Sequence, residues 1–179
     1  MKVIEQEIHS LKNSISEMWA LVHQQLYNAG EAMLTGDKEL AYKVISRERR
    51  VNAFELKIDS DCEDIIALYA PVAIDLRFVL AMYKINTNLE RLGDFAESIA
   101  RFAGNLPEGE PIDPQLVKET RVEEMLSELL SMISLTKEAF EKESSEIASR
   151  IFLKDNLIDE INHNSVSYTH LTLPTIRLV

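Results

Sequence analysis

Residues 75–100 read DLRFVLAMYKINTNLERLGDFAESIA. Apolar residues recur every three or four positions through this stretch and just before it, which is the spacing of one buried stripe on an α-helix. The pattern predicts a long helix from Pro71 to about Ala103. One helix cannot bury such a stripe alone, so packing against other helices must stabilise it. The stripe comprises Ile74, Phe78, Met82, Ile85, Leu89, Leu92, Ala96 and Ile99.

Two further helical stripes precede this stretch. The first helix is predicted to end at Gly30 and the TGD cluster at 35–37, where Asp37 or Thr35 can cap the next helix. The second helix is predicted over residues 38–69. Three long antiparallel helices with short turns predict a three-helix bundle. The stripes comprise Ile4, Ile8, Leu11, Ile15, Met18, Val22 and Leu26, and then Leu40, Val44, Val51, Phe54, Ile58, Ile65 and Leu68.

The glycines and prolines divide the chain into two parts. Half of them crowd into GNLPEGEPIDP at residues 104–114, and this density marks a linker. After the linker, Asp113 can cap a helix that has Pro114 at its first position. The apolar residues of this helix and of one more that follows it are Leu116, Val117, Val122, Leu126, Leu129, Leu130, Ile133 and Leu135, and then Ile147, Ile151 and Ile158.

An internal repeat connects the two parts. The segment AMLTGDKELAYKVISRERRVN, which begins at Ala32, aligns without gaps with AFEKESSEIASRIFLKDNLID, which begins at Ala139, at an offset of 107 residues. We infer a duplication, and chance agreement between two amphipathic helices is the alternative. The second copy would lack its third helix, because the equivalent of Pro71 falls at about position 178. The predicted fold class is all-α, with tandem three-helix bundles of which the second is incomplete.

The predicted boundaries are 1–104 for the first bundle, 105–114 for the linker, 115–165 for the partial second bundle and 166–179 for a non-native tail. The tail lacks a helical period, and VSYTHLTLPT at its start resembles the translation of a transposon-type sequencing-library adapter. A genuine strand-like tail is the alternative. Sequencing the locus from intact genomic DNA separates the two, because a native reading frame through Val179 would contradict the adapter origin.

Charge and cysteine content exclude several classes of protein. Lys and Arg number 19 and Asp and Glu number 30, for a net charge of −11, which argues against a general nucleic-acid binder because such proteins need a basic face. The single cysteine, Cys62, excludes a disulfide scaffold and a thiolate-rich zinc site. The sequence shows neither a signal peptide nor a run of ~18 apolar residues. We therefore expect a cytoplasmic protein with no membrane span.

Two pairs of carboxylates stand out by their spacing. Glu55 and Asp59 lie in ELKID, and Glu90 and Asp94 lie in LERLGD. Each pair is four residues apart and projects from one helical face. Like charges at this spacing repel each other, and a cation would relieve the repulsion if the two helices packed antiparallel. All-oxygen ligation suits hard cations such as Mg, Ca, Mn or iron.

The alternative is a solvated acidic face that Lys57 and Arg91 neutralise, with an ordinary ion pair between Glu97 and Arg101 beside it. The sequence contains no Walker, GxGxxG or GxSxG motif. The acidic neighbours of Cys62 should raise the pKa of its thiol, which argues against a nucleophile. These observations predict a protein that is not an enzyme.

Three further features have structural interpretations. Gly93 lies inside a predicted helix at a cost of ~1 kcal/mol relative to Ala. A close approach by a neighbouring helix or a bound ion would explain it, and tolerated variation is the alternative. The basic run SRERRV at 46–51 is predicted to lie on a solvated helix face, and His9, His23 and His163 are predicted to be solvated surface residues.

The motifs together resemble the PhoU domain. The family's Asp-Leu-Arg segment is found at 75–77, its Lys-Ile pair at 84–85, and its Leu-Glu-Arg-Ile-Gly-Asp motif at 89–94, with Leu92 in place of the usual Ile. In addition, VNAFELKID resembles the family's second-helix motif, and MWALVHQQLYNAGEAMLTGDKELAYKVI its first helix and turn. The resemblance covers about residues 1–165.

The resemblance implies two tandem three-helix bundles in a cytoplasmic regulator of phosphate uptake. Such a regulator works with the ATPase of the phosphate ABC transporter and with a sensor histidine kinase, at the inner face of the membrane through these partners. It represses the phosphate-starvation response when phosphate is plentiful. The resemblance also implies a homodimer. Two alternatives are a PhoU-like module of a sodium/phosphate cotransporter or permease, and a carboxylate-bridged metal enzyme.

A metal site is also implied. Family members carry Glu/Asp-x-x-x-Asp motifs that bind iron, zinc or magnesium, and these map onto the pairs Glu55/Asp59 and Glu90/Asp94. The second motif of the LERIGD type is absent from this chain, so the resemblance implies no complete second site. Asp159 lies where part of that second site would form.

Overall fold

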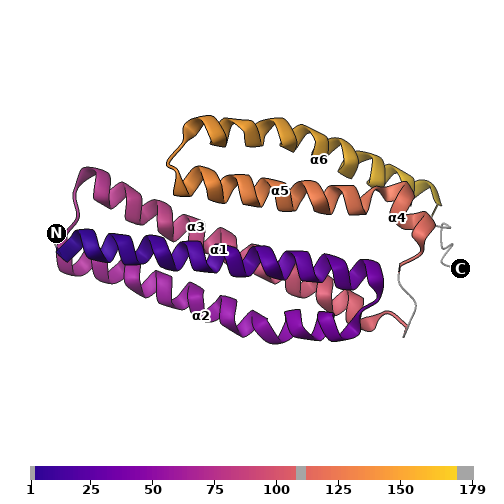
Figure 1. Ribbon diagram of the computed structural model, residues 1–179, viewed down its shortest axis with the longest axis horizontal. Coiled ribbons are helices and arrows are strands. Elements are labelled where there is room, and N and C mark those ends of the chain that lie inside the picture. Colours follow the sequence, from indigo (N-terminus) through magenta and orange to yellow (C-terminus); the bar gives the residue numbers. More distant parts are fainter. Residues whose placement is uncertain (1–2, 108–111, 173–179) are drawn as a thin grey trace, which may run out of the picture.

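The computed structural model describes residues 3–107 and 112–172, and every regular element in these ranges is an α-helix. The predicted all-α class is therefore confirmed. The three N-terminal helices form one bundle, and the C-terminal helices lie along one side of it (Figure 1). The helices are α1 (Val3–Thr35), α2 (Lys38–Tyr69), α3 (Ala73–Asn105), α4 (Pro114–Thr120), α5 (Val122–Glu141) and α6 (Ser145–Thr172).

The first bundle encloses the main core of the protein. Helices α1, α2 and α3 each turn their apolar stripe inward, as their periodicity predicts. Two predicted stripe residues, Leu68 and Ile74, are instead exposed. They flank the turn between α2 and α3 at the end of the bundle (Figure 1), where the helices stop and solvent reaches the side chains. The core includes Leu11, Ile15, Met18, Trp19, Val22, Leu26, Val44, Val51, Ile58, Ile65, Val79, Met82 and Leu89.

The turn from α1 to α2 lies later than Gly30, because α1 continues through Gly30 to Thr35. The chain reverses at Gly36, whose φ of 71° lies in the left-handed region that glycine tolerates best. Asp37 then caps α2, since its Oδ1 accepts a 2.9 Å hydrogen bond from the Leu40 N–H. Of the two caps considered from the sequence, the structure uses Asp37.

The helix after the linker is interrupted once. Asp113 caps α4, with its Oδ1 accepting a hydrogen bond from the Gln115 N–H at 2.8 Å, and Pro114 is the first helical residue, as predicted. Arg121 then adopts a φ of 52° and divides the expected single helix into α4 and α5. Periodicity did not reveal this break, because the apolar spacing continues across it.

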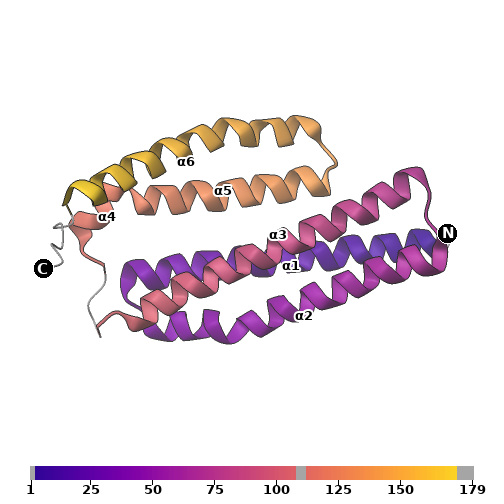
Figure 2. The ribbon, with the colours of Figure 1, turned by 180° about the vertical axis from the view of Figure 1, so that it is seen from behind.

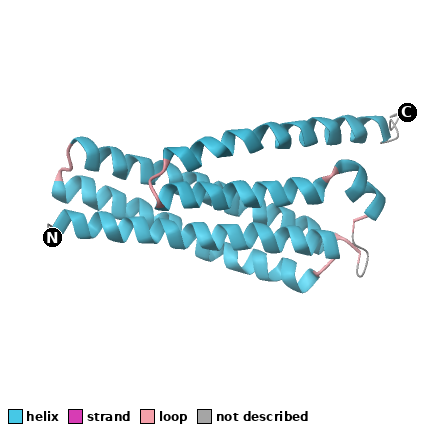
Figure 3. Ribbon diagram, turned by 45° about the horizontal axis from the view of Figure 1, so that its top comes forward, coloured by secondary structure: helices cyan, strands magenta, loops and turns pink. Residues whose placement is uncertain are grey.

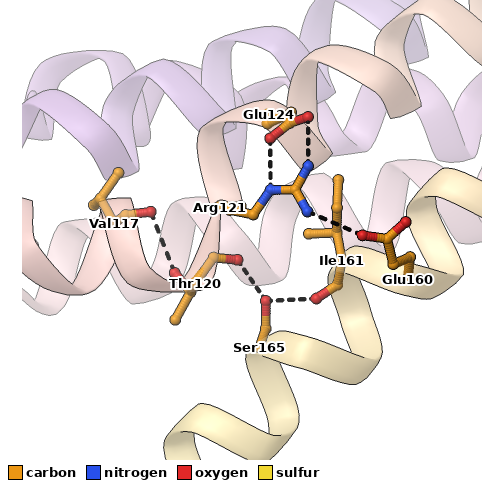
Figure 4. Close-up of polar contacts among 7 residues, drawn as sticks. All are labelled: Val117, Thr120, Arg121, Glu124, Glu160, Ile161 and Ser165. Atoms are coloured by element: carbon orange, nitrogen blue, oxygen red, sulfur yellow. Dashed lines mark hydrogen bonds and ion pairs between the residues drawn. The ribbon is translucent and has the colours of Figure 1, made fainter.

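Polar contacts hold this break against α6. The guanidinium of Arg121 donates two hydrogen bonds of 2.8 Å to the Glu124 carboxylate and lies 3.5 Å from Glu160 of α6 (Figure 4). The Ser165 hydroxyl donates to the Thr120 carbonyl at the end of α4. Together these contacts join the first turn of α5 and the end of α4 to one face of α6.

Helix α6 extends beyond the predicted domain boundary at 165. Its backbone is helical through Thr172, so residues 166–172 do not form the strand-like tail considered from the sequence. Residues 173–179 lie outside the described part of the chain. The adapter origin of 166–179 stays a prediction. Within the described ranges the C-terminal unit contains two long helices, α5 and α6, against three in the first bundle.

The two units meet where α5 lies along α1 (Figures 1 and 2). Trp19 of α1 stacks on Phe140 of α5 with ring centroids 5.8 Å apart, and the Lys12 ammonium lies 5.5 Å from the Phe140 ring centroid. Lys12 also forms a 2.7 Å ion pair with Glu143. At the other end of α5, a Cβ built on Gly30 would lie 2.1 Å from Leu126 Cδ2. Gly30 therefore allows α5 to approach α1 closely.

We expect Gly30→Ala to loosen the packing of α5 on α1 and to cost about 1–3 kcal/mol of stability, because the new methyl group overlaps the Leu126 side chain. Trp19, the only tryptophan, is buried beside this interface, so its fluorescence emission should shift to longer wavelength. The double variant Gly30→Ala/Leu126→Ala should recover the wild-type emission. Gly104→Ala is the matched control, since no atom lies within 4 Å of the added Cβ. Equal emission from Gly30→Ala and Gly104→Ala would contradict the expectation.

Candidate metal centre between α2 and α3

Glu90, one of the four predicted carboxylates, lies near acidic residues of both α2 and α3. The two helices pack side by side along their length, which brings the ELKID and LERLGD motifs near each other. Burial, followed by the charges of Asp94 and Glu55, raises the pKa of Glu90. An interaction with the Asp94 side chain raises this pKa further. Glu90 is therefore within electrostatic reach of Asp94 on its own helix and of Glu55 on α2.

Asp59, the fourth predicted residue, has a different partner. Its Oδ1 accepts a 2.7 Å hydrogen bond from the Asn86 side-chain amide, which also donates to the Glu55 backbone carbonyl at 2.9 Å. Asn86 is fully buried and lies one helical turn before Glu90. Asp59 therefore lies beside an amide. We call the acidic residues Glu48, Glu55, Asp59, Glu90 and Asp94 of α2 and α3 the carboxylate row.

Glu48 is the site residue that the sequence analysis missed. Only 5% of its surface is exposed, and neither carboxylate oxygen has a hydrogen-bond partner among the described residues. Burial first, and then the charges of three carboxylates on α3, raise the pKa of Glu48 to about 7. These carboxylates are Asp94, Glu97 and Glu90. A buried, unpartnered carboxylate facing other carboxylates is costly unless a proton or a cation neutralises it.

The spacing of Glu48 was a usable signal. It lies seven residues before Glu55, which is two turns along the same helical face. The basic run around it was predicted to be solvated, and Arg47, Arg49 and Arg50 are indeed exposed. Glu48 itself turns inward from the middle of that run. Glu48 was not predicted from the sequence because exposed cations lie on both sides of it.

Neither cation considered from the sequence, Lys57 or Arg91, forms an ion pair with the carboxylate row in the described part of the chain. Lys57 donates to Asp61 at 2.6 Å and to the Ser14 hydroxyl at 3.1 Å, and so faces α1. Arg91 is exposed. Its charge lowers the pKa of Glu90, but burial and the charges of Asp94 and Glu55 raise that pKa by more. The predicted pair between Glu97 and Arg101 is present at 2.6 Å. No cation is among the groups that shift the pKa of Glu48.

Gly93 explains how α3 approaches this part of α2. A Cβ built at Gly93 would lie 2.9 Å from Cγ1 of Val51, a fully buried residue. This confirms the predicted close approach of a neighbouring helix. Val51 follows Glu48 by three residues and Gly93 directly precedes Asp94. The contact therefore brings α3 close to α2 beside Glu48 and Asp94.

Comparison with known proteins establishes the family. The PhoU domain model matches residues 15–103. The chain is 35% identical over 159 residues to the phosphate-specific transport system accessory protein PhoU homolog of Aquifex aeolicus, a match that covers 88% of this chain and 69% of that protein. The chain belongs to the PhoU family. All the carboxylates described above lie within the matched PhoU domain.

Other PhoU proteins are also similar to this chain in sequence and in structure. The chain is 34% identical over 154 residues to the phosphate-specific transport system accessory protein PhoU of Escherichia coli, covering 86% of this chain and 62% of that protein. The crystal structure of the phosphate transport system regulatory protein PhoU from Streptococcus pneumoniae superposes with a TM-score of 0.77 at 30% identity, over 88% of this chain and 72% of that one. The crystal structure of PhoU from Pseudomonas aeruginosa superposes with a TM-score of 0.81 at 26% sequence identity. The match covers 94% of this chain and 81% of that one.

The donor set of this PhoU domain fits a hard cation. All the facing groups are carboxylates, which is the chemistry that hard cations prefer, and Glu48 keeps two buried oxygens without a partner. In the described part of the chain, no three His, Cys, Asp or Glu side chains converge on one point as they stand. A cation would therefore require side-chain rotation. The four-ligand site of Glu55, Asp59, Glu90 and Asp94 stays a prediction.

Other candidate groups of the PhoU chain do not enter the site. Burial, with smaller contributions from Asp59, Asp61 and Glu63, raises the pKa of Cys62 to about 12. The predicted direction is confirmed, and burial is the main cause. The thiol donates weakly to the Val79 carbonyl at 3.9 Å. Cys62 is therefore a protonated core residue at neutral pH.

Proposed function

We propose that this chain is an accessory protein of a phosphate-specific transport system that represses the phosphate-starvation response when phosphate is plentiful. The supporting observation is the 35% identity over 88% of the chain to a protein of that name. In this role it works in the cytoplasm with the ATPase of the phosphate ABC transporter and a sensor histidine kinase. No described helix is long and apolar enough to cross a membrane.

The proposed role is regulatory and non-catalytic. The thiol near the carboxylate row, that of Cys62, is buried and has a pKa raised to about 12, so it is not a nucleophile at neutral pH. Ser134 and His23 meet at 3.0 Å between α1 and α5, away from this row. Regulation by binding needs only a surface and a structural state that partners can recognise.

The proposal includes a cation held by Glu48, Glu90 and Asp94, with Glu55 and Asp59 as the flanking pair. The cation supplies positive charge that offsets the repulsion among these carboxylates. The pKa of Glu48 is raised to about 7, so its carboxyl group must lose any bound proton to act as a ligand. Burial also raises the pKa of Glu90. Cation affinity should therefore increase as the pH rises through about 7, the value of Glu48.

Isothermal titration calorimetry with Mg²⁺, Mn²⁺, Zn²⁺ and, without oxygen, Fe²⁺ tests the cation site. We expect Glu48→Gln, and separately Glu90→Gln/Asp94→Asn, to weaken binding about tenfold or more. Glu55→Gln/Asp59→Asn tests the flanking pair. Glu17→Gln, which removes an exposed carboxylate of α1, is the control. Equal affinity in the wild type and in Glu90→Gln/Asp94→Asn would refute the assignment.

A gene deletion tests the regulatory role. In the source organism, loss of the gene should raise alkaline phosphatase activity at high phosphate, and the gene restored from a plasmid should lower it again. Unchanged repression in the deletion strain would count against the proposal. A plasmid-borne gene whose protein binds metal in vitro but does not restore repression in the deletion strain would separate the regulatory role from the cation site.

A further inference from the structure

We propose that one half of the groove between α1 and α3 is a docking site for an amphipathic helix of another protein, with Lys and Arg beside its apolar stripe. Helix α5 covers the other half of this groove and ends at Glu141. The half beyond that end, which we call the open groove, is lined mainly by Ile8, Lys12, Ile74, Phe78, Met82 and Phe140. The site shares no residue with the carboxylate row and does not depend on a bound cation.

Helix α5 shows which kind of element fits the groove. Ile133 of α5 lines a small cavity of about 240 Å³ together with Ile85 of α3 and Trp19 of α1. Ile85 also lines the open groove beyond the end of α5. Phe140, in the last turn of α5, stacks on Trp19 and lines the open groove as well. The covered and open halves are therefore one continuous groove, and an amphipathic helix already lies over the covered half.

No described element covers the open groove. The turn between α5 and α6 lies short of the end of the bundle at which α1 starts and α2 turns into α3 (Figures 1 and 3). The lining residues extend from Glu5 to Lys12 of α1 and from Ile74 to Ile85 of α3, so the groove is about 16 Å long at 1.5 Å per helical residue. This length, with a volume of about 710 Å³, suits about three turns of a helix.

Apolar side chains continue from the open groove onto the turn between α2 and α3. Ile74 at the mouth of the groove is 79% exposed, and Val72 and Leu68, just before it in the chain, are 74% and 72% exposed. Contiguous exposed apolar surface on a protein of this kind marks a site of interaction. A helix with large apolar residues three and four positions apart would cover both the groove and its mouth.

The charged residues around the open groove indicate the polar edges of the partner. Three acids lie there, Glu5, Asp75 and Glu143, and the basic residues are Lys12 and His9. Lys12 forms a 2.7 Å ion pair with Glu143, so negative charge dominates the rim. Lys and Arg on both edges of the partner's apolar stripe would complement this rim. A second copy of this chain is a poorer occupant, because its net charge of −11 would add repulsion.

A labelled synthetic peptide of about 18 residues, with Leu at helical spacing and Lys elsewhere, is the probe for this site. Fluorescence anisotropy with the full 179-residue chain should give a dissociation constant about tenfold lower, or lower still, than for a peptide of the same composition in scrambled order. A periodic peptide with Glu in place of Lys should bind more weakly, because the rim is acidic. Equal affinities for the periodic and scrambled Lys peptides, or tighter binding of the Glu peptide, would overturn the proposal.

Two pairs of glutamine substitutions test the location. Ile74→Gln/Ala81→Gln places polar side chains in the open groove and should weaken binding of the periodic Lys peptide about tenfold. Leu56→Gln/Ala53→Gln is the matched control, because it replaces one large apolar residue and one alanine at exposed positions of α2 that do not line the groove. Circular dichroism checks that both variants remain helical. Equal peptide affinities of the two variants would overturn the proposal.

Sedimentation velocity separates a partner helix from a second copy as the occupant of the open groove. We expect the same oligomeric state for the wild type and for Ile74→Gln/Ala81→Gln, since the groove serves another protein. A change of oligomeric state in that variant, with none in Leu56→Gln/Ala53→Gln, would assign the groove to a second copy and overturn the proposal.

Discussion

Asn86→Asp is expected to lower the free energy of unfolding by about 3–5 kcal/mol at pH 8, the range for an uncompensated buried charge. Asn86 is fully buried, and its amide donates to the Asp59 carboxylate at 2.7 Å and to the Glu55 carbonyl at 2.9 Å. An ionised carboxylate of the same shape donates to neither oxygen. It would also bring a third negative charge next to Asp59 and near Glu90.

The pH dependence of this loss distinguishes charge from shape. Burial and neighbouring anions raise the pKa of a carboxyl group in the folded state, so the new group destabilises the fold increasingly as the pH rises from acid to 8. At pH 5 the protonated form can still donate to Asp59, and part of the stability should return. Urea unfolding at both pH values measures this.

Asn88→Asp is the matched control for Asn86→Asp. Asn88 is exposed on the same helix, where its amide donates to the Lys84 backbone carbonyl at 2.9 Å. A carboxylate there remains hydrated and should cost less than about 1 kcal/mol, as surface substitutions usually do. Similar losses for Asn86→Asp and Asn88→Asp would show that the buried amide does not hold α2 and α3 together as described.

Glu48→Gln is expected to raise the free energy of unfolding by about 2–3 kcal/mol at pH 8 in chelator-treated buffer. The folded-state pKa of Glu48 is about 7, against an ordinary value of 4.5. Its contribution to stability is therefore complete below about 4.5 and is lost as the pH rises through 7. Glutamine keeps the shape and stays neutral, so the advantage of the variant should increase over this pH window.

Urea unfolding of the wild type and Glu48→Gln at pH 5 and pH 8 checks this expectation, with Glu17→Gln as the control that should show no such pH-dependent difference. Added divalent cation should stabilise the wild type more than Glu48→Gln, because a ligand stabilises the state that binds it. A stability difference between wild type and Glu48→Gln that is the same at both pH values would contradict the raised pKa.

The local features of this PhoU-family chain could be predicted from short sequence patterns. The bounds of α2, the caps Asp37 and Asp113, and the all-α class depend on residues a few positions apart. The Glu97–Arg101 ion pair depends on a four-residue spacing within one helix. The break at Arg121 was not predictable in this way, because contacts with Glu124 and with Glu160 on α6 accompany it.

The sequence by itself determined which residues share a helical face, because 3.6 residues per turn places Glu55 with Asp59 and Glu90 with Asp94. Only the tertiary structure decided which faces meet. The Val51 side chain packs on Gly93, and beside this contact Glu48 is buried, where the charge of Asp94 helps to raise its pKa. The register between two helices results from side-chain packing over the whole interface. Spacing within either helix does not contain that information.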